Sequence, residues 1–179
     1  MIELLLGINF IKLTSVTSEI ALAFNEWENN PELIPFIRPN RSQTDLDQRE
    51  TVTAETLQKR LEHDVIFLIY EGEQLIGEMN YQVDPKHLFK KEPGTAWIGI
   101  NIGEESARGK GAGTLAMQYL EQQIKLEGLK RIELGVFEFN TKAIKLYQKT
   151  GYQEISRIQD FTYWRGKLWQ DIRMEKYLE

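Results

Sequence analysis

The stretch that decides the fold is IGINIGEESARGKGAGTLAMQ, residues 98–118. Its first five residues have the apolar alternation of a β-strand, and its last part opens an apolar helix. Residues 108–114, where the two meet, contain three glycines and the cations Arg108 and Lys110. Glycines let backbone N–H groups approach an anion, and a helix start leaves N–H donors unpaired. The stretch therefore predicts a phosphate site, although a glycine cluster alone also fits a plain surface turn.

The composition sets limits on the protein's partners. The 179 residues are 41% hydrophobic and show no linker, so we expect one domain, 1–179, with a sizeable core. The net charge of -5 disfavours nucleic acid and favours cationic small molecules or amine-bearing peptides. The absence of cysteine excludes disulfides, thiolate metal sites and a cysteine nucleophile. His63 and His87 do not form a ligand pair, so no metal site is expected.

The first residues are apolar but contain Glu3 and Asn9, without a basic leader or a small-residue cleavage site. We expect a first strand from about Glu3 to Leu13 rather than a signal peptide. No stretch approaches the ~20 apolar residues of a membrane helix. The expectation is therefore a cytoplasmic protein with no membrane partner.

The rest of the chain alternates strands and helices. Thr17 or Ser18 can cap a helix that ends before Pro31, and a second helix is expected from Thr53 to His63. The proline-containing segment between them should be irregular or briefly helical, and such segments often form one wall of a cleft. The later elements are expected as strands at 65–70, 75–83 and 95–102, a helix at 111–128, a strand at 131–137, a helix at 140–151, and strands at 152–159 and 167–177. This order predicts an α/β fold with a sheet of mixed direction.

Two phosphate motifs compete for the glycine-rich joint. A P-loop fails on spacing, because Gly103 and Gly109 are one residue too far apart and Gly111 replaces the hydroxyl ligand. Residues 111–116 do fit the dinucleotide fingerprint, and Glu133 lies near the expected distance for a ribose contact. Against it, eight polar residues separate the strand from Gly111, and the preceding meander is antiparallel. A dinucleotide-binding oxidoreductase domain therefore remains an alternative.

A third interpretation rests on two motifs together. Residues 108–113, RGKGAG, match the pattern Arg/Gln-x-x-Gly-x-Gly/Ala, and residues 140–152, NTKAIKLYQKTGY, match Asn-x-x-Ala-x-x-Leu-Tyr-x-Lys-x-Gly-Phe/Tyr. In this order, they resemble the GNAT superfamily of acetyl-coenzyme A dependent N-acetyltransferases. The resemblance covers about 95–157, and residues 27–31 are similar to the branch that acts on protein N-termini and small amines. It implies a mainly antiparallel sheet with helices on both faces, the acyl-CoA N-acyltransferase fold.

The resemblance also implies a cofactor site. The sheet should splay between the strands at 95–102 and 131–137, with the pantetheine arm of acetyl-CoA in the gap. Backbone groups of the first strand would bond this arm and polarise the thioester, and the loop would bind pyrophosphate. The implied cofactor-binding residues are Ile100, Asn101, Ile102, Arg108, Gly109, Lys110, Gly111, Ala112, Gly113, Thr114 and Asn140.

The implied reaction is direct transfer of acetyl from sulfur to a neutral amine in a ternary complex. Tyr147 resembles the family's general acid, with a plain core tyrosine as the alternative. Many relatives place a basic carboxylate on the strand at 95–102, but residues 98–102 have none. Glu78, on the neighbouring strand, is our candidate base; the alternatives are a solvated strand carboxylate at this position and water as the base.

The acceptor and the functional class remain open. A non-catalytic sensor of acetyl-CoA would share most of these features. Polyamines, aminoglycoside-like amines and peptide N-termini all suit the acidic composition. The closing strands could also pair across a homodimer as an exposed edge.

Overall fold

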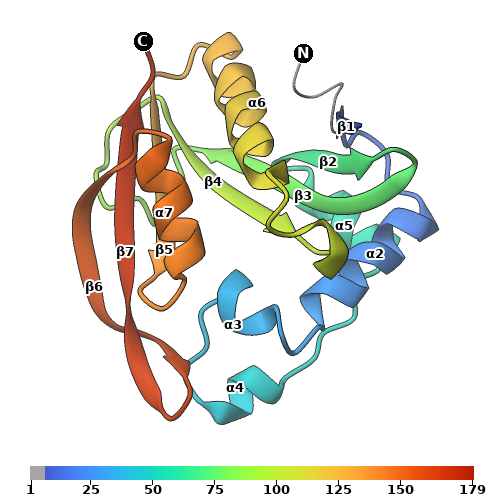
Figure 1. The fold of residues 1–179 in the computed structure, drawn as a ribbon, viewed down its shortest axis with the longest axis horizontal. Helices are drawn as coiled ribbons and strands as arrows, with labels where there is room; N and C mark the ends of the chain where they lie inside the picture. Colours follow the sequence, from blue (N-terminus) through green and yellow to red (C-terminus); the bar gives the residue numbers. More distant parts are fainter. Residues whose placement is uncertain (1–6) are drawn as a thin grey trace.

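The computed structural model describes residues 7–179, which contain a single seven-stranded sheet (Figure 1). The strand order is β1-β2-β3-β4-β5-β7-β6, and all neighbours are antiparallel except β4 and β5. The strands are β1 (Ile8–Lys12), β2 (Val65–Glu71), β3 (Gln74–Val83), β4 (Thr95–Ile102), β5 (Arg131–Phe137), β6 (Gln153–Trp164) and β7 (Lys167–Tyr177). The predicted mixed, mainly antiparallel sheet is confirmed.

Helices cover both faces of the sheet. They are α2 (Ser18–Glu28), α3 (Ile34–Ile37), α4 (Gln43–Asp47), α5 (Ala54–Arg60), α6 (Ala112–Leu126) and α7 (Thr141–Lys149), with a 3-10 turn, η1, at Glu105–Ala107. The larger apolar cluster packs α6 and α7 against one face, with Leu120 and Ile124 fully buried. A second cluster on the other face packs Phe24 of α2 and Leu57 of α5 against β2.

Local signals place the helix starts where the sequence predicts them. The hydroxyls of Thr17 and Thr53 accept the backbone N–H groups of Ile20 and Thr56, and these bonds begin α2 and α5. The second helix ends at Arg60, earlier than predicted. Of the predicted first strand, residues 8–12 form β1, and residues 3–6 lie outside the described part of the chain.

The prediction that a strand ends at Gln159 is wrong, because β6 continues to Trp164. Its pairing with β7 is irregular between Ile158 and Thr162, where Asp160 has a φ of 50°. The bulge interrupts the alternation of side chains without ending the strand. Since β7 lies inside the sheet, only β6 of the closing pair presents an edge.

The sheet splits in its middle, as the motif resemblance implies. The parallel strands β4 and β5 pair only at three positions, from Thr95–Arg131 to Trp97–Glu133. Beyond Trp97, β4 keeps its pairing with β3 as far as Ile102, and β5 keeps its pairing with β7 as far as Phe137. The sheet therefore has a gap between residues 98–102 and 134–137.

Helix α2 packs against the end of β4. A Cβ on Gly103 would lie 2.3 Å from the ring of Trp27, so only glycine allows this contact. The indole Nε1 also donates to Oε1 of Glu104 at 3.0 Å. The contact joins α2 to the residues that connect β4 with the glycine-rich loop.

Within residues 7–179, no helix is long and apolar enough to cross a membrane.

Candidate active site

A cavity of about 760 Å³ lies at the gap in the sheet. Its lining includes residues of α2 and α3, the facing strands β3, β4, β5 and β7, and helix α7. Five of the sequence-predicted site residues line it: Glu78, Ile100, Asn101, Asn140 and Tyr147. The glycine-rich loop lies at the adjoining end of β4, and its residues do not line this cavity.

The glycine-rich loop presents unpaired backbone donors. Gly109 and Gly111 have φ values of 73° and 91°, which glycine adopts without strain, and α6 starts directly afterwards without a side-chain cap. The first backbone bond of this helix joins the N–H of Leu115 to the carbonyl of Gly111. Within the described chain, the N–H groups of residues 109–114 have no protein acceptor. Together with the helix dipole, they suit a phosphate group.

Arg108 is bound to the end of β4. Its Nε donates to the carbonyl of Ile102 at 2.9 Å, and its Nη2 donates to the carbonyl of Gly103 at 2.7 Å. Lys110, by contrast, is exposed. The geometry therefore gives Arg108 a role in fixing the loop, and its predicted direct contact with pyrophosphate stays a prediction.

Helix α7 turns one face toward the cavity. Oδ1 of Asn140 accepts the N–H of Ala143 at 3.3 Å and caps the helix. Asn140, Ala143 and Tyr147 all line the cavity, as their spacing of three and four residues allows. The amide Nδ2 of Asn140 has no acceptor in the described structure, so it can donate to a ligand.

Tyr147 keeps its proton throughout the neutral range. Its half-buried ring meets the ring of Tyr152 edge-on at a centroid distance of 5.9 Å. Desolvation raises the pKa of Tyr147 to about 12, because burial disfavours the phenolate. Its position in the cavity wall argues against a plain core tyrosine and leaves the phenol able to donate a proton.

Glu78 is buried at the cavity wall rather than solvated. It is 8% exposed and lies opposite Asn101 of β4. Its two oxygens accept bonds from Nδ2 of Asn80 at 3.2 and 3.0 Å, and Nη2 of Arg60 is 3.7 Å away. Burial raises the pKa of Glu78, and the nearby Arg60 and the bond from Asn80 partly oppose this.

Arg60 stands among three carboxylates. Its guanidinium lies 3.5 Å from Glu28 and 2.6 Å from Asp64, besides its approach to Glu78. One cation thus faces three acids, which leaves an excess of negative charge beside the cavity. This excess favours a cationic ligand.

The sequence interpretation missed the opposite wall, formed by Asp171 and Arg173 of β7. Both are buried and line the cavity, and Nε of Arg173 donates to Oδ2 of Asp171 at 2.7 Å. The guanidinium also lies over the ring of Trp97, 4.7 Å from its centroid. A signal was present, because charged residues alternate at 171, 173 and 175 in a strand that lies inside the sheet.

Glu133 is not free to bind a ribose. It is fully buried, accepts a bond from Nη2 of Arg131 at 2.6 Å, and accepts the backbone N–H groups of Phe89 and Lys90. Its carboxylate fixes the loop between β3 and β4. The dinucleotide interpretation therefore has no free carboxylate at Glu133 for the ribose contact.

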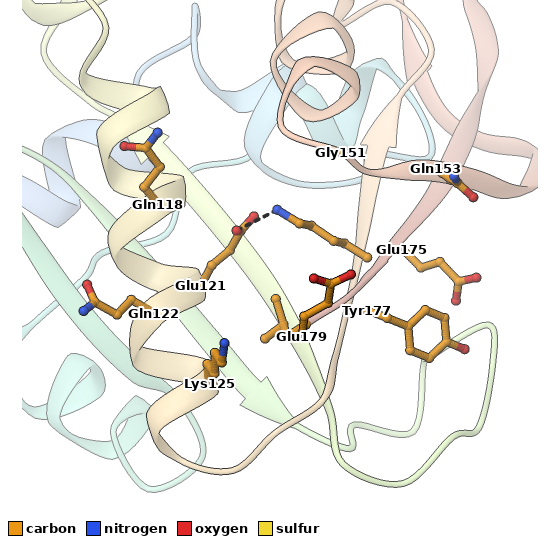
Figure 2. A pocket seen from close by; sticks show the side chains of 11 residues that line it. Gln118, Glu121, Gln122, Lys125, Gly151, Gln153, Glu175, Tyr177 and Glu179 are labelled. Carbon is orange, nitrogen blue, oxygen red and sulfur yellow. Dashed lines mark hydrogen bonds and ion pairs between the residues drawn. The ribbon is translucent and has the colours of Figure 1, made fainter.

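A second hollow, of about 620 Å³, lies between α6 and the end of β7 (Figure 2). The ion pair between Glu121 and Lys176, at 2.8 Å, crosses it. None of the sequence-predicted site residues lines this hollow. The candidate site is therefore the cavity at the split.

A sheet that splits beside a glycine-rich helix start has the architecture of the acyl-CoA N-acyltransferases. Residues 23–152 match the model of the Acetyltransferase (GNAT) family, and because this is more than half of the chain, the chain belongs to that family.

Curated relatives point in the same direction over a shorter stretch. The chain is 37% identical over 87 residues to the spermine/spermidine N(1)-acetyltransferase of Bacillus subtilis. The aligned stretch makes up 48% of this chain and 57% of that protein. The match thus spans little more than half of the relative's length.

Solved structures resemble the whole fold. The spermidine N-acetyltransferase from Vibrio cholerae, solved in complex with CoA and spermine, has a TM-score of 0.74 at 17% identity and covers 96% of this chain and 95% of its own. The ribosomal-protein-alanine N-acetyltransferase from Brucella melitensis has a TM-score of 0.73 at 17% identity, covering 92% of this chain and 98% of its own. At this identity, both similarities concern the fold.

Proposed function

We propose that the protein transfers the acetyl group of acetyl-CoA to a primary amine of a polyamine or a similar small cationic amine. The amine attacks the thioester directly while both substrates are bound. The observation that carries the proposal is the carboxylate-lined cavity at the unpaired part of β4. The named activity of the Bacillus relative supports it.

The cosubstrate site follows from the unpaired backbone groups. Ile100 and Asn101 line the gap and offer the pantetheine arm an inner strand edge, with Nδ2 of Asn140 on the opposite side, whereas the carbonyl of Ile102 is already bonded to Arg108. An N–H group near Ile100 or Asn101 would polarise the thioester carbonyl. The N–H groups of residues 109–114 would hold the pyrophosphate. The acyl donor would then lie with its sulfur toward Tyr147.

The acceptor side is acidic and aromatic. Four acids line the cavity, Glu28, Glu50, Glu78 and Asp171, against three arginines, Arg38, Arg60 and Arg173. Aromatic rings from α3, β4 and β5 complete the wall and suit the methylene chain of a linear amine.

An amine scan tests the proposal. The purified protein is mixed with acetyl-CoA and one acceptor at a time, and release of the CoA thiol is followed. Spermine and spermidine should give turnover above an amine-free control. Turnover only with an N-terminal alanine peptide would assign a peptide N-terminus instead. Acetyl-CoA binding by calorimetry without turnover on any amine would indicate a sensor.

Arg108 should support cosubstrate binding by holding the loop. Arg108→Ala removes two bonds to backbone carbonyls, so we expect acetyl-CoA affinity to fall about 10-fold or more while the fold is kept. Arg108→Lys keeps the charge but cannot form the same fork, and should lose nearly as much. Calorimetry measures both variants. Unchanged affinity in folded Arg108→Ala would contradict the proposal, and full affinity in Arg108→Lys would mean that charge alone matters.

A further inference from the structure

We infer that Asp171 binds the second, non-reacting ammonium group of a linear polyamine, across the split in the sheet from Glu78. The inference rests on the proposed function and adds a residue that sets acceptor specificity. It follows from where the two carboxylates lie, how Asp171 is held and what surrounds it.

The two carboxylates lie at the same level on opposite sides of the gap. Glu78 is paired with Asn101 of β4, and Asp171 is paired with Phe137 of β5. Trp97 and Glu133 form the last pair between β4 and β5. Asn101 lies four residues after Trp97, and Phe137 lies four residues after Glu133. An even number of residues returns the side chain to the same face of a strand, so both carboxylates share one face of the sheet.

The distance between them suits an elongated ligand. Each carboxylate is one strand removed from the gap, so three strand spacings separate their backbones, at least ~14 Å at ~4.8 Å per spacing. The side chains both reach toward the cavity and shorten this span. A ligand with one ammonium group could meet only one of the two, whereas a linear chain with two ammonium groups could meet both.

Asp171 is buried and is held in place by a hydrogen bond from Arg173. It is 3% exposed, and only its Oδ2 accepts a bond from a described residue, Arg173. Arg173 is itself divided among several partners, since its Nη1 donates to the carbonyl of His87 at 2.9 Å and lies 3.6 Å from Glu133. Oδ1 of Asp171 therefore remains available to a cation in the cavity.

A glycine on β5 lets the carboxylate of Asp171 reach the floor of the cavity. A Cβ on Gly135 would lie 2.9 Å from Oδ2 and 3.0 Å from Oδ1 of Asp171, and 3.0 Å from the ring of Trp97, so only glycine lets the carboxylate and the indole approach β5 this closely. Phe137 and Phe161 also line this side, with ring centroids 6.2 Å apart. The guanidinium of Arg173 already lies over the rings of Trp97 and Phe161, 4.7 and 5.9 Å from their centroids. The rings therefore offer apolar contact to the methylene groups of the ligand rather than a second cation site.

The test compares a long diamine with the matching monoamine. Wild-type protein should use diaminooctane with a kcat/KM at least ~10-fold above that for octylamine, because only the diamine can reach both carboxylates. Asp171→Asn keeps the shape and removes the charge. It should raise KM for diaminooctane by ~10- to 100-fold and leave kcat/KM for octylamine within about twofold. Glu154→Gln, which neutralises an exposed acid on the neighbouring strand β6, serves as the control. It should change neither the KM for diaminooctane nor the kcat/KM for octylamine.

Each other outcome overturns the inference. Equal use of both amines by the wild-type protein would show that no second carboxylate takes part, even if Asp171→Asn fails to fold. An equal loss for both amines in folded Asp171→Asn would give Asp171 a structural or catalytic role instead. If the wild-type protein acetylates no amine, the proposed function itself fails. If it acetylates polyamines and Asp171→Asn leaves KM unchanged, only the inference fails.

Discussion

Tyr147→Phe should lower kcat by ~10²- to 10⁴-fold while acetyl-CoA affinity stays nearly unchanged. Phenylalanine keeps the ring and its packing beside Tyr152 but removes the proton that the departing thiolate needs. Because the pKa of Tyr147 is raised to about 12, the phenol stays protonated as pH rises through the neutral and mildly alkaline range. Ionisation of Tyr147 should therefore cause no loss of activity in that range. Steady-state kinetics and calorimetry on the same preparation separate kcat from affinity.

Tyr152→Phe is the matched control for this prediction. Tyr152 is 3% exposed, touches the ring of Tyr147 and does not line the cavity, and its hydroxyl has no partner in the described structure. Its loss should leave kcat nearly unchanged. Full turnover in Tyr147→Phe, or a joint loss of stability and binding, would make Tyr147 a packing residue and place the acid elsewhere.

Glu78→Gln should lower kcat/KM by ~10²-fold at neutral pH and by less at high pH. At neutral pH the amine is mainly protonated and needs a base, whereas at high pH neutral amine is already abundant. Burial raises the pKa of Glu78, so its basic, ionised form is lost as pH falls through a value above the ordinary carboxylate range. The wild-type rate should therefore fall on the acidic side at a higher pH than an exposed glutamate would give.

The pH profile of the variant decides the role of Glu78. The ratio of variant to wild-type kcat/KM should rise with pH, and Glu55→Gln, an exposed acid on α5, should keep a ratio near one. A ratio for Glu78→Gln that is constant across pH would instead favour bulk water as the base. A change in KM alone would make Glu78 a binding residue for the ammonium.

The elements around the glycine joint could be predicted from sequence because their signals are local. Glycines at positive φ, an asparagine cap and apolar periodicity act within a few residues, so β4, α6 and α7 lie where the pattern places them. Asn140 and Tyr147 are seven residues apart, about two turns of an α-helix, so they share one face of α7, and both line the cavity. The family resemblance is confirmed by the match over residues 23–152.

The environment of the charged residues could not be predicted, because it depends on three-dimensional contacts that the sequence pattern does not show. Glu78 is buried beside Arg60, which α5 brings to within 3.7 Å of it. Asp171 needs Gly135 on another strand to approach the cavity floor. Arg108 bonds carbonyls at the end of β4, which a linear motif does not reveal. The bulge at Asp160 likewise breaks the alternation on which strand prediction depends.

The short connection between β4 and β5 divides the main-chain hydrogen bonds of the sheet into two parts. Three residue pairs join these strands, whereas seven join β3 to β4 and seven join β5 to β7. The first part contains β1 to β4, and the second contains β5, β7 and β6. Because few main-chain hydrogen bonds join β4 to β5, we expect the two parts to open with different free energies, although they share one apolar cluster. Amide hydrogen exchange would then resolve two opening events in the free protein, and a ligand that bonds both inner edges would merge them into one.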